Sequence, residues 1–172
     1  MRLKALSALA AVALLAACET TPTSGSSAEG RGIGRDGISG RPDVSADAAR
    51  NAAMRGSPEY FRQTVGDRVF FDLDRWDLRP DARATLEKQA AWLKEFPQRG
   101  ILIEGHADER GTREYNLAIA DRRANATKEY LVTLGIPANR IKVVSYGKER
   151  PAVVGSNETS YAQNRRSVTV VQ

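Results

Sequence analysis

The sequence predicts an α/β domain in which helices pack on one face of a small mixed β-sheet. Short segments rich in β-forming residues alternate with two longer segments whose apolar residues recur every three or four positions. Proline and glycine mark the boundaries between these segments, and residues 58–172 provide enough chain for one core. The expected order of strands and helices is β-α-β-α-β-β, which favours helices layered against a sheet.

Two helices are expected. The first spans residues 80–96, because proline suits the first turn of a helix and Pro97 ends it. The second spans residues 115–134, because Gly135 suits the position just past a helix end and Pro137 follows. The predicted buried faces are Leu86, Ala90 and Leu93 on the first helix, and Ala120, Ala124, Thr127, Leu131 and Leu134 on the second.

Four short strands complete the domain. Residues 69–73 and 167–171 are rich in β-branched and aromatic residues, and the second of these segments alternates in polarity. Residues 101–103 and 141–146 are apolar runs that indicate buried strands. The segment 156–166 is polar, with one helical turn expected at residues 161–164.

The N-terminus carries the signals of an exported, lipid-anchored chain. Two basic residues precede an uncharged, mostly apolar run over residues 5–17, which is too short to span a bilayer as a helix. The run ends in Leu-Ala-Ala-Cys at Cys18, the only cysteine, and resembles a bacterial lipobox. That resemblance implies cleavage before Cys18 and acylation of it; an ordinary secretory signal is the alternative. Because residue 19 is Glu rather than the inner-membrane retention signal Asp, the periplasmic face of the outer membrane is the expected location.

Residues 19–57 differ in composition from the rest of the chain. They hold seven of the fourteen glycines and only four large apolar residues, too few to offset the entropy of ordering. We expect a flexible tether here, with a short, weakly capped helix over residues 47–55 as the one ordered candidate. The expected boundaries are therefore 1–17 for the signal peptide, 18–57 for the lipidated Cys and tether, and 58–172 for the folded domain.

Composition limits the chemistry. A formal charge of +5 permits a polyanionic partner, but two of the basic residues belong to the signal peptide and no interleaved basic and aromatic groove is visible, which disfavours nucleic acid. One His and one Cys argue against a metal cage, the one Cys is assigned to the lipid anchor, and no paired His is present. We therefore expect no catalytic residues, no metal and no cofactor.

The densest polar cluster lies at residues 104–112, between a predicted buried strand and a helix, where α/β folds place ligands. Within it, His106 with Asp108 and Glu109 is a weak metal pattern, and a ring that braces the loop by hydrogen bonding is the favoured interpretation. Asp72 and Asp74 straddle a predicted strand end and could share a face as paired carboxylates, but no acid/base partner or nucleophile accompanies them. One Asp that contacts ligand and one that caps or is solvated is the favoured interpretation. The string at residues 164–166 (NRR) is interpreted as mainly structural, with an edge contribution to a pocket left open.

Four strings resemble the OmpA-like C-terminal domain family, most closely its lipid-anchored, peptidoglycan-associated branch. They are GHADERGTREYN at 105–116, RRAN at 122–125, SYGKERP at 145–151 and NRR at 164–166, within a match over residues 69–171. The resemblance implies a site for the zwitterionic end of meso-diaminopimelate, with Asp108 receiving the ammonium and Arg123 the carboxylate. It also implies supporting contacts, from Phe71, Asp72, Arg110, Thr112 and Leu117.

By the same resemblance, the chain would tether the outer membrane to peptidoglycan non-covalently, as part of the Tol system in envelope integrity and cell division, with TolB and TolA as partners. Three alternatives stay open at this point. The chain is a wall-binding lipoprotein outside the Tol system, it is an enzyme acting on peptidoglycan, or Asp108 and Arg123 form a structural salt bridge with no ligand role.

Overall fold

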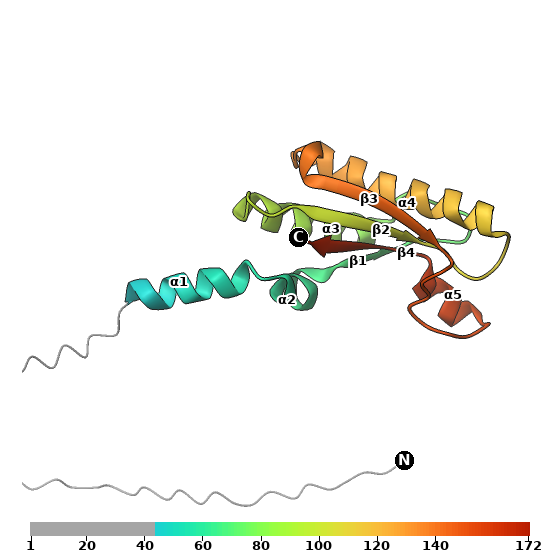
Figure 1. The fold of residues 1–172 in the computed structure, drawn as a ribbon, viewed down its shortest axis with the longest axis horizontal. Coiled ribbons are helices and arrows are strands. Elements are labelled where there is room, and N and C mark those ends of the chain that lie inside the picture. Colours follow the sequence, from blue (N-terminus) through green and yellow to red (C-terminus); the bar gives the residue numbers. More distant parts are fainter. Residues whose placement is uncertain (1–43) are drawn as a thin grey trace, which may run out of the picture. The chain divides into compact units, whose positions relative to one another are not determined.

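The computed structural model describes residues 44–172, so the expectations for Cys18 and for the rest of the first 43 residues lie outside the described part of the chain. Figure 1 shows the arrangement of its elements. In chain order these are α1 (Val44–Arg55), α2 (Pro58–Tyr60), the π-helical η1 (Phe61–Gly66), β1 (Arg68–Phe70), α3 (Pro80–Glu95), β2 (Ile101–His106), α4 (Arg113–Thr133), the 3-10 helix η2 (Ala138–Arg140), β3 (Ile141–Gly147), α5 (Glu158–Asn164) and β4 (Arg166–Val171).

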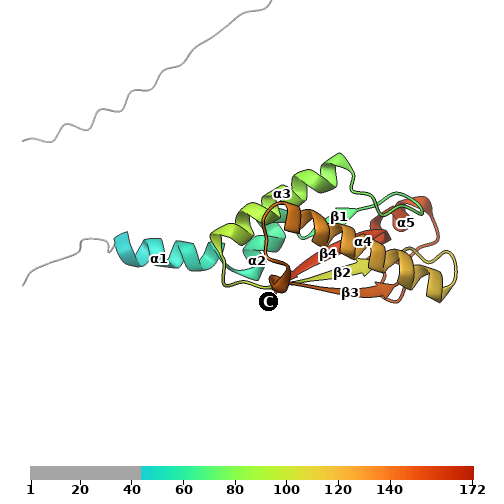
Figure 2. The same ribbon diagram turned by 90° about the horizontal axis from the view of Figure 1, so that it is seen from above.

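The four strands form one mixed sheet in the order β1-β4-β2-β3. β4 pairs antiparallel with both β1 and β2, whereas β2 and β3 are parallel. Both long helices, α3 and α4, cover the same face of the sheet (Figure 2). This arrangement confirms the predicted α/β fold with helices on one face of a small mixed sheet.

The core lies between the sheet and the two long helices. The predicted apolar face of α3 is buried, and on α4 the face that contains Ala120, Ala124, Thr127 and Leu131 is buried as well. A polar link crosses this core, because the Thr169 hydroxyl of β4 donates to Gln89 Oε1 of α3 at 2.9 Å. Burying polar groups is costly unless they are paired, so this hydrogen bond allows both side chains to lie in the core.

The strand boundaries differ from those predicted, and the differences matter for the site. β1 ends at Phe70 instead of residue 73, whereas β2 continues past residue 103 to His106 because β3 pairs with it along its length. Asp72 and Asp74 therefore lie in a turn and not on a strand, and Asp74 has φ of 53°. The expectation that these two carboxylates share a strand face is wrong, since the extended backbone it requires ends before them.

Part of the segment expected to be tether is helical. α1 begins three residues before the short helix considered for residues 47–55. Its C-terminal end is held by the domain: Trp92 Nε1 donates to the Arg55 carbonyl at 2.8 Å, and the Arg55 guanidinium lies 2.8 Å from Glu95. Among the described residues, no helix combines the length and apolar character needed to cross a membrane.

Close packing of β2 on α4 yields a first prediction. A Cβ added at Gly105 would lie 2.0 Å from the Ala120 carbonyl oxygen, a backbone atom that cannot turn aside. Gly105→Ala should lower the free energy of unfolding by about 2 kcal/mol or more, measured by urea denaturation. Gly100→Ala is the control, because its new Cβ would meet nothing nearer than 3.6 Å. Equal stability of the two variants would contradict this packing.

Candidate functional site

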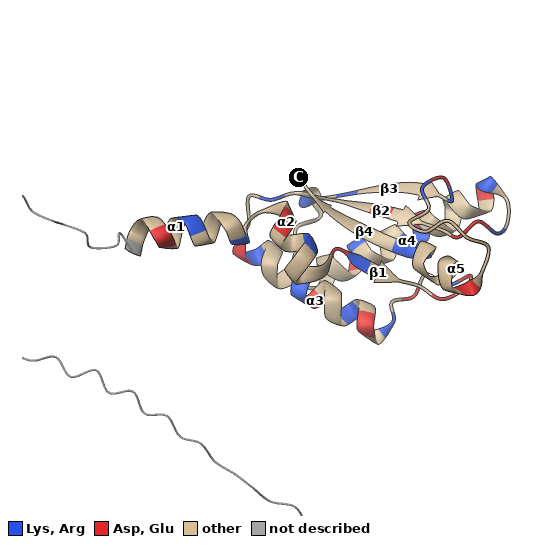
Figure 3. Ribbon diagram, turned by 90° about the horizontal axis from the view of Figure 1, so that it is seen from below, with Lys and Arg blue, Asp and Glu red and all other residues tan. Residues whose placement is uncertain are grey.

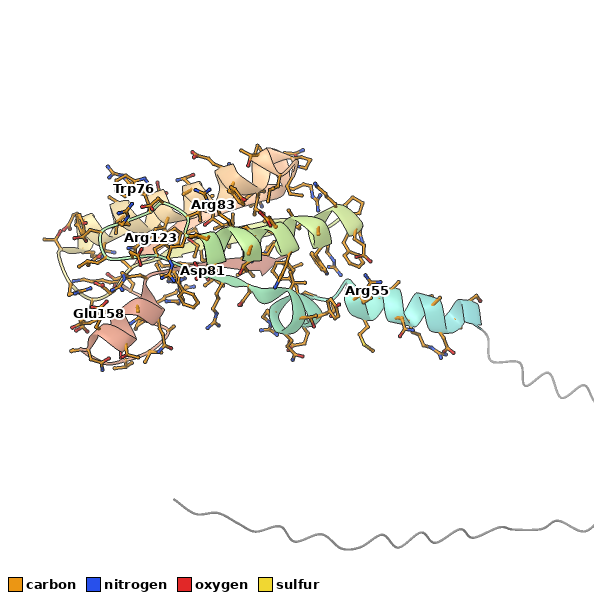
Figure 4. The ribbon with its side chains drawn as sticks, turned by 180° about the vertical axis from the view of Figure 1, so that it is seen from behind. Arg55, Trp76, Asp81, Arg83, Arg123 and Glu158 are labelled. Carbon is orange, nitrogen blue, oxygen red and sulfur yellow. The ribbon has the colours of Figure 1, made fainter. Side chains whose placement is uncertain are left out.

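The site lies at one edge of the sheet. β1, β2 and β3 run in the same direction, so their carboxyl ends meet at this edge, next to the start of β4. A pocket of about 330 Å³ opens among the loops that follow these strands. Its lining residues are Leu73, Asp74, Ala107, Asp108, Arg110, Gly111, Tyr115, Asn116, Ile119, Arg123 and Arg165. Figure 4 labels Trp76, Arg123 and Glu158 at this end of the domain.

Arg123 forms the inner wall of the pocket. It projects from α4 and is only 1% exposed. Its Nε donates to the carbonyl of Arg75 at 2.9 Å and its Nη2 to that of Asp72 at 3.1 Å, both in the loop after β1. Its Nη1 donates to the carbonyl of His106, at the end of β2, at 3.1 Å. One guanidinium therefore joins two chain segments to α4.

The charge of Arg123 has no carboxylate partner among residues 44–172, because no acidic group lies within ion-pair distance of it. A guanidinium has five N–H donors, and three are used here, which leaves one on each Nη atom. Burial and the nearby charge of Arg165 lower the pKa of Arg123 to about 10. The group therefore stays protonated at neutral pH, and it lines the pocket as a buried cation that is held by backbone carbonyls and not by a carboxylate within ion-pair distance among the described residues.

Asp108 provides the negative charge of the pocket. Its Oδ1 accepts from the backbone N–H of Arg110 at 3.1 Å, and its Oδ2 lies 2.6 Å from Arg110 Nη2 and 3.2 Å from Arg165 Nη1. Burial acts to raise the pKa of Asp108, but the hydrogen bonds from Arg110 and Arg165 outweigh it and hold that pKa below its ordinary value. Asp108 and Arg123 are not a salt bridge to each other in the described structure.

Arg165 has a larger part in the site than the sequence indicated. The NRR string was interpreted as mainly structural, and Arg165 does hold the Phe71 carbonyl through Nε at 3.1 Å. The same side chain also pairs with Asp108 and lines the pocket. Because 57 residues separate it from Asp108, only the antiparallel pairing of β4 brings the two together. In the sequence, the NRR string was the one feature that could have indicated this role of Arg165.

The sequence did not indicate the contact between Tyr115 and Asp74 that forms the rim of the pocket. The Tyr115 hydroxyl, from the first turn of α4, donates to Asp74 Oδ1 in the loop after β1 at 2.9 Å. Asp74 holds a left-handed backbone conformation that is uncommon outside glycine. Leu73 beside it is half exposed, so the rim is partly apolar around a charged interior.

Of the seven ligand residues that the resemblance implied, Asp108, Arg110 and Arg123 line the pocket and four do not. The Phe71 ring is buried, 5.5 Å from the Arg123 guanidinium. Asp72 contributes its carbonyl to Arg123, while its side chain lies 3.3 Å from Arg79. Thr112 caps α4 by accepting from the Tyr115 N–H, and the carbonyl of half-buried Leu117 accepts from the Ser145 hydroxyl.

His106 supports the site through its backbone and not through its ring. Its carbonyl holds Arg123, whereas neither ring nitrogen meets hydrogen-bond geometry with another described residue. The expected hydrogen-bonding brace is thus supplied by the carbonyl of His106, while the ring packs against Tyr146 with centroids 5.6 Å apart and its Nε2 lies 3.7 Å from Glu104 Oε2. Within residues 44–172 no three potential metal ligands gather at one point.

Charged residues of both signs lie on the loops beside α5 (Figure 3). A cation and an anion fixed in one pocket can together hold a ligand that carries both charges. The arrangement therefore suits binding and orientation of a zwitterion.

Comparison with known proteins gives consistent matches. The model of the OmpA family matches residues 70–165. A protein of Rhizobium meliloti named peptidoglycan-associated lipoprotein is 51% identical over 140 residues, which cover 78% of this chain and 80% of the relative. The protein of the same name from Brucella melitensis is 57% identical over 120 residues, covering 70% of this chain and 71% of the relative.

Solved structures agree with the fold. The crystal structure of the peptidoglycan-associated lipoprotein from Burkholderia pseudomallei has a TM-score of 0.63 and 42% identity, and covers 67% of this chain and 100% of that one. The C-terminal domain of Helicobacter pylori MotB has a TM-score of 0.58 at 19% identity, covering 62% and 84% of the two chains. At 19% identity, the similarity to MotB supports the fold alone.

Arg123→Ala should cost stability, since the variant leaves three backbone carbonyls without their charged donor. We expect the free energy of unfolding to fall by about 3 kcal/mol or more, measured by urea denaturation. The control is Arg122→Ala: Arg122 neighbours Arg123 on α4, is exposed and stacks on Trp76 at 4.8 Å, so about 1 kcal/mol or less should be lost. Similar losses in both variants would refute the bracing role of Arg123.

The single histidine allows a direct pH test. Burial, together with the nearby charges of Arg166 and Arg150, lowers the pKa of His106 to about 4. Because the folded protein favours the neutral ring, this group contributes stability above pH 6.5, and that contribution declines as the pH falls from about 6.5 to about 4. Titration of the one imidazole signal by NMR should give a native midpoint near 4; a midpoint near 6.5 would show an accessible ring.

Proposed function

Because the chain belongs to the OmpA family and, within it, to the peptidoglycan-associated lipoproteins, we propose that it binds the meso-diaminopimelate side chain of peptidoglycan stem peptides non-covalently. The observation that carries this proposal is the buried guanidinium of Arg123. It lines the pocket and lacks a carboxylate partner among the described residues, so an anionic ligand would complete it.

The chemistry of the ligand matches the two charges of the pocket. The free end of meso-diaminopimelate carries an ammonium and a carboxylate on one carbon. The two unused Nη donors of Arg123 can hold the carboxylate in a fork, which a lysine cannot reproduce. Asp108 would receive the ammonium. Arg123 lies on α4, and Asp108 lies in the loop after β2, where Arg110 and Arg165 hold its carboxylate, so little ordering is needed on binding.

The other predicted contacts differ in whether they line the pocket. Arg110 lines the pocket and is the strongest of them. Phe71 and the Asp72 carbonyl act behind Arg123 and would shape the site without touching the ligand. Thr112 and Leu117 support α4, and we assign them an indirect role.

The N-terminal signals support a location of this binding domain in the envelope. We propose that Cys18 carries acyl chains in the outer membrane, and that residues 19–43 act as a tether that lets the domain reach the wall. A head that is anchored this way has a raised effective concentration at the peptidoglycan layer. Membership of the family supports participation in the Tol system, with TolB and TolA as partners.

The family is one of binding proteins and not of enzymes, which confirms the expectation that the chain is not an enzyme. A wall-binding lipoprotein outside the Tol system would use the same pocket.

The proposal is tested with the full chain in detergent and two kinds of purified sacculi. Sacculi cross-linked through meso-diaminopimelate should retain the protein, whereas sacculi with lysine at that position should not, because lysine lacks the terminal carboxylate. Arg123→Lys and Asp108→Asn should each weaken retention at least tenfold, about 1.4 kcal/mol. Circular dichroism should establish that each variant is folded at the assay temperature.

Equal retention on both kinds of sacculi would replace zwitterion recognition with general charge or glycan attraction, and the assignment of Asp108 and Arg123 would fall. Retention on neither would leave a lipoprotein whose partners are proteins alone.

A further inference from the structure

Four charged side chains form a closed ring of alternating charge beside the pocket. Asp108 Oδ2 lies 2.6 Å from Arg110 Nη2, and Arg110 Nη1 lies 3.5 Å from Glu158 Oε2. Glu158 Oε1 lies 2.7 Å from Arg165 Nη2, and Arg165 Nη1 returns to Asp108 Oδ2 at 3.2 Å. Glu158, the first residue of α5, is therefore held by the same two arginines as the pocket carboxylate.

The two halves of this ring differ in exposure. The side chains of Asp108 and Arg165 are each 6% exposed, whereas those of Arg110 and Glu158 are 38% and 65% exposed. Arg165 is also fixed by the Phe71 carbonyl, so it cannot leave its place without breaking the junction with β1. While it contacts Asp108, the Arg110 guanidinium also lies over the Tyr161 ring at 4.3 Å and 3.5 Å from Glu158.

The position of Glu158 itself is well determined. Asn157 caps α5 by accepting from the Ser160 N–H at 2.9 Å, and the Tyr161 hydroxyl donates to Glu109 Oε1 at 2.9 Å. The first bond fixes the start of α5, and the second joins α5 to the loop that carries Asp108. Glu158 does not line the pocket, yet its carboxylate is fixed relative to the groups that do.

This geometry creates competition for Asp108. Two guanidinium groups already contact its carboxylate, so a ligand ammonium arriving at Asp108 is a third cation in a small volume. The ammonium binds well only if one of the arginines can shift part of its charge elsewhere. Arg110 is the exposed member, and Glu158 is the anion on its other side.

We propose that Glu158 is a positioning and specificity-determining residue: it pairs with Arg110 and Arg165 on the side away from Asp108 and offsets part of their charge, so that Asp108 can accept an ammonium. This assignment rests on the proposed function, since it concerns the ammonium end of the same ligand. Removing the charge of Glu158 leaves both arginines directed at Asp108 alone, and recognition of the ammonium weakens while the carboxylate end at Arg123 is unaffected.

Calorimetry on the full chain tests this with two soluble probes. The first is the stem tripeptide L-Ala-γ-D-Glu-meso-diaminopimelate, and the second is the same peptide acetylated on the distal amine, which cannot use Asp108. Glu158→Gln should weaken binding of the first about fivefold and leave binding of the second unchanged. Glu158→Asp keeps the charge and should recover most of the affinity.

Glu149→Gln is the matched control, because Glu149 is an exposed carboxylate 3.1 Å from Arg113 that lines no part of the pocket. It should change the binding of neither peptide.

The outcomes separate the two ideas. If the unaltered chain binds neither peptide, or both equally, the proposed function falls and the role of Glu158 falls with it. If it prefers the free amine and Glu158→Gln keeps that preference, the function stands and the role of Glu158 is refuted. An equal loss for both peptides in Glu158→Gln would show a purely structural residue and would also overturn the assignment.

Discussion

The burial of one guanidinium group is the constraint on which the site depends. A charge removed from water must be surrounded by dipoles or by an opposite charge. In this domain three backbone carbonyls surround Arg123, two from the loop after β1 and one from the end of β2. Solvating this cation therefore also fixes the loops that form the pocket, and it ties them to α4.

The pocket keeps a cation and an anion together without letting them neutralise each other. Arg123 is satisfied by carbonyls, and Asp108 is satisfied by Arg110 and Arg165. A direct pair between Arg123 and Asp108 would consume the charges that a zwitterionic ligand needs. Since the partners of each group are different, both retain capacity for a ligand, and the cost of burying them is spread over the surrounding structure.

Much of the fold follows from local sequence signals. The proline and glycine boundaries of α3 and α4 and their apolar spacing place both helices correctly to within two residues. Their predicted buried faces are buried except for Leu134, which lies just past the end of α4 and is half-buried. The errors are in the strand boundaries, at places where contacts with other segments determine where a strand ends. β2 extends to His106 because β3 accompanies it, and β1 stops at Phe70 because the chain turns toward Arg123. Such limits depend on residues far away in sequence, which no local pattern contains.

The sequence alone determined the fold class, the two helices with their buried faces, and the polar segment that contains Asp108, because these depend on residue spacing and on short strings. Only the tertiary structure decided which groups meet there. It joined Arg165 and Glu158 to Asp108, placed Tyr115 against Asp74, and gave Arg123 its carbonyl partners. The physical reason is that these contacts arise where the carboxyl ends of β1, β2 and β3 meet the start of β4, so sheet order and strand register set them.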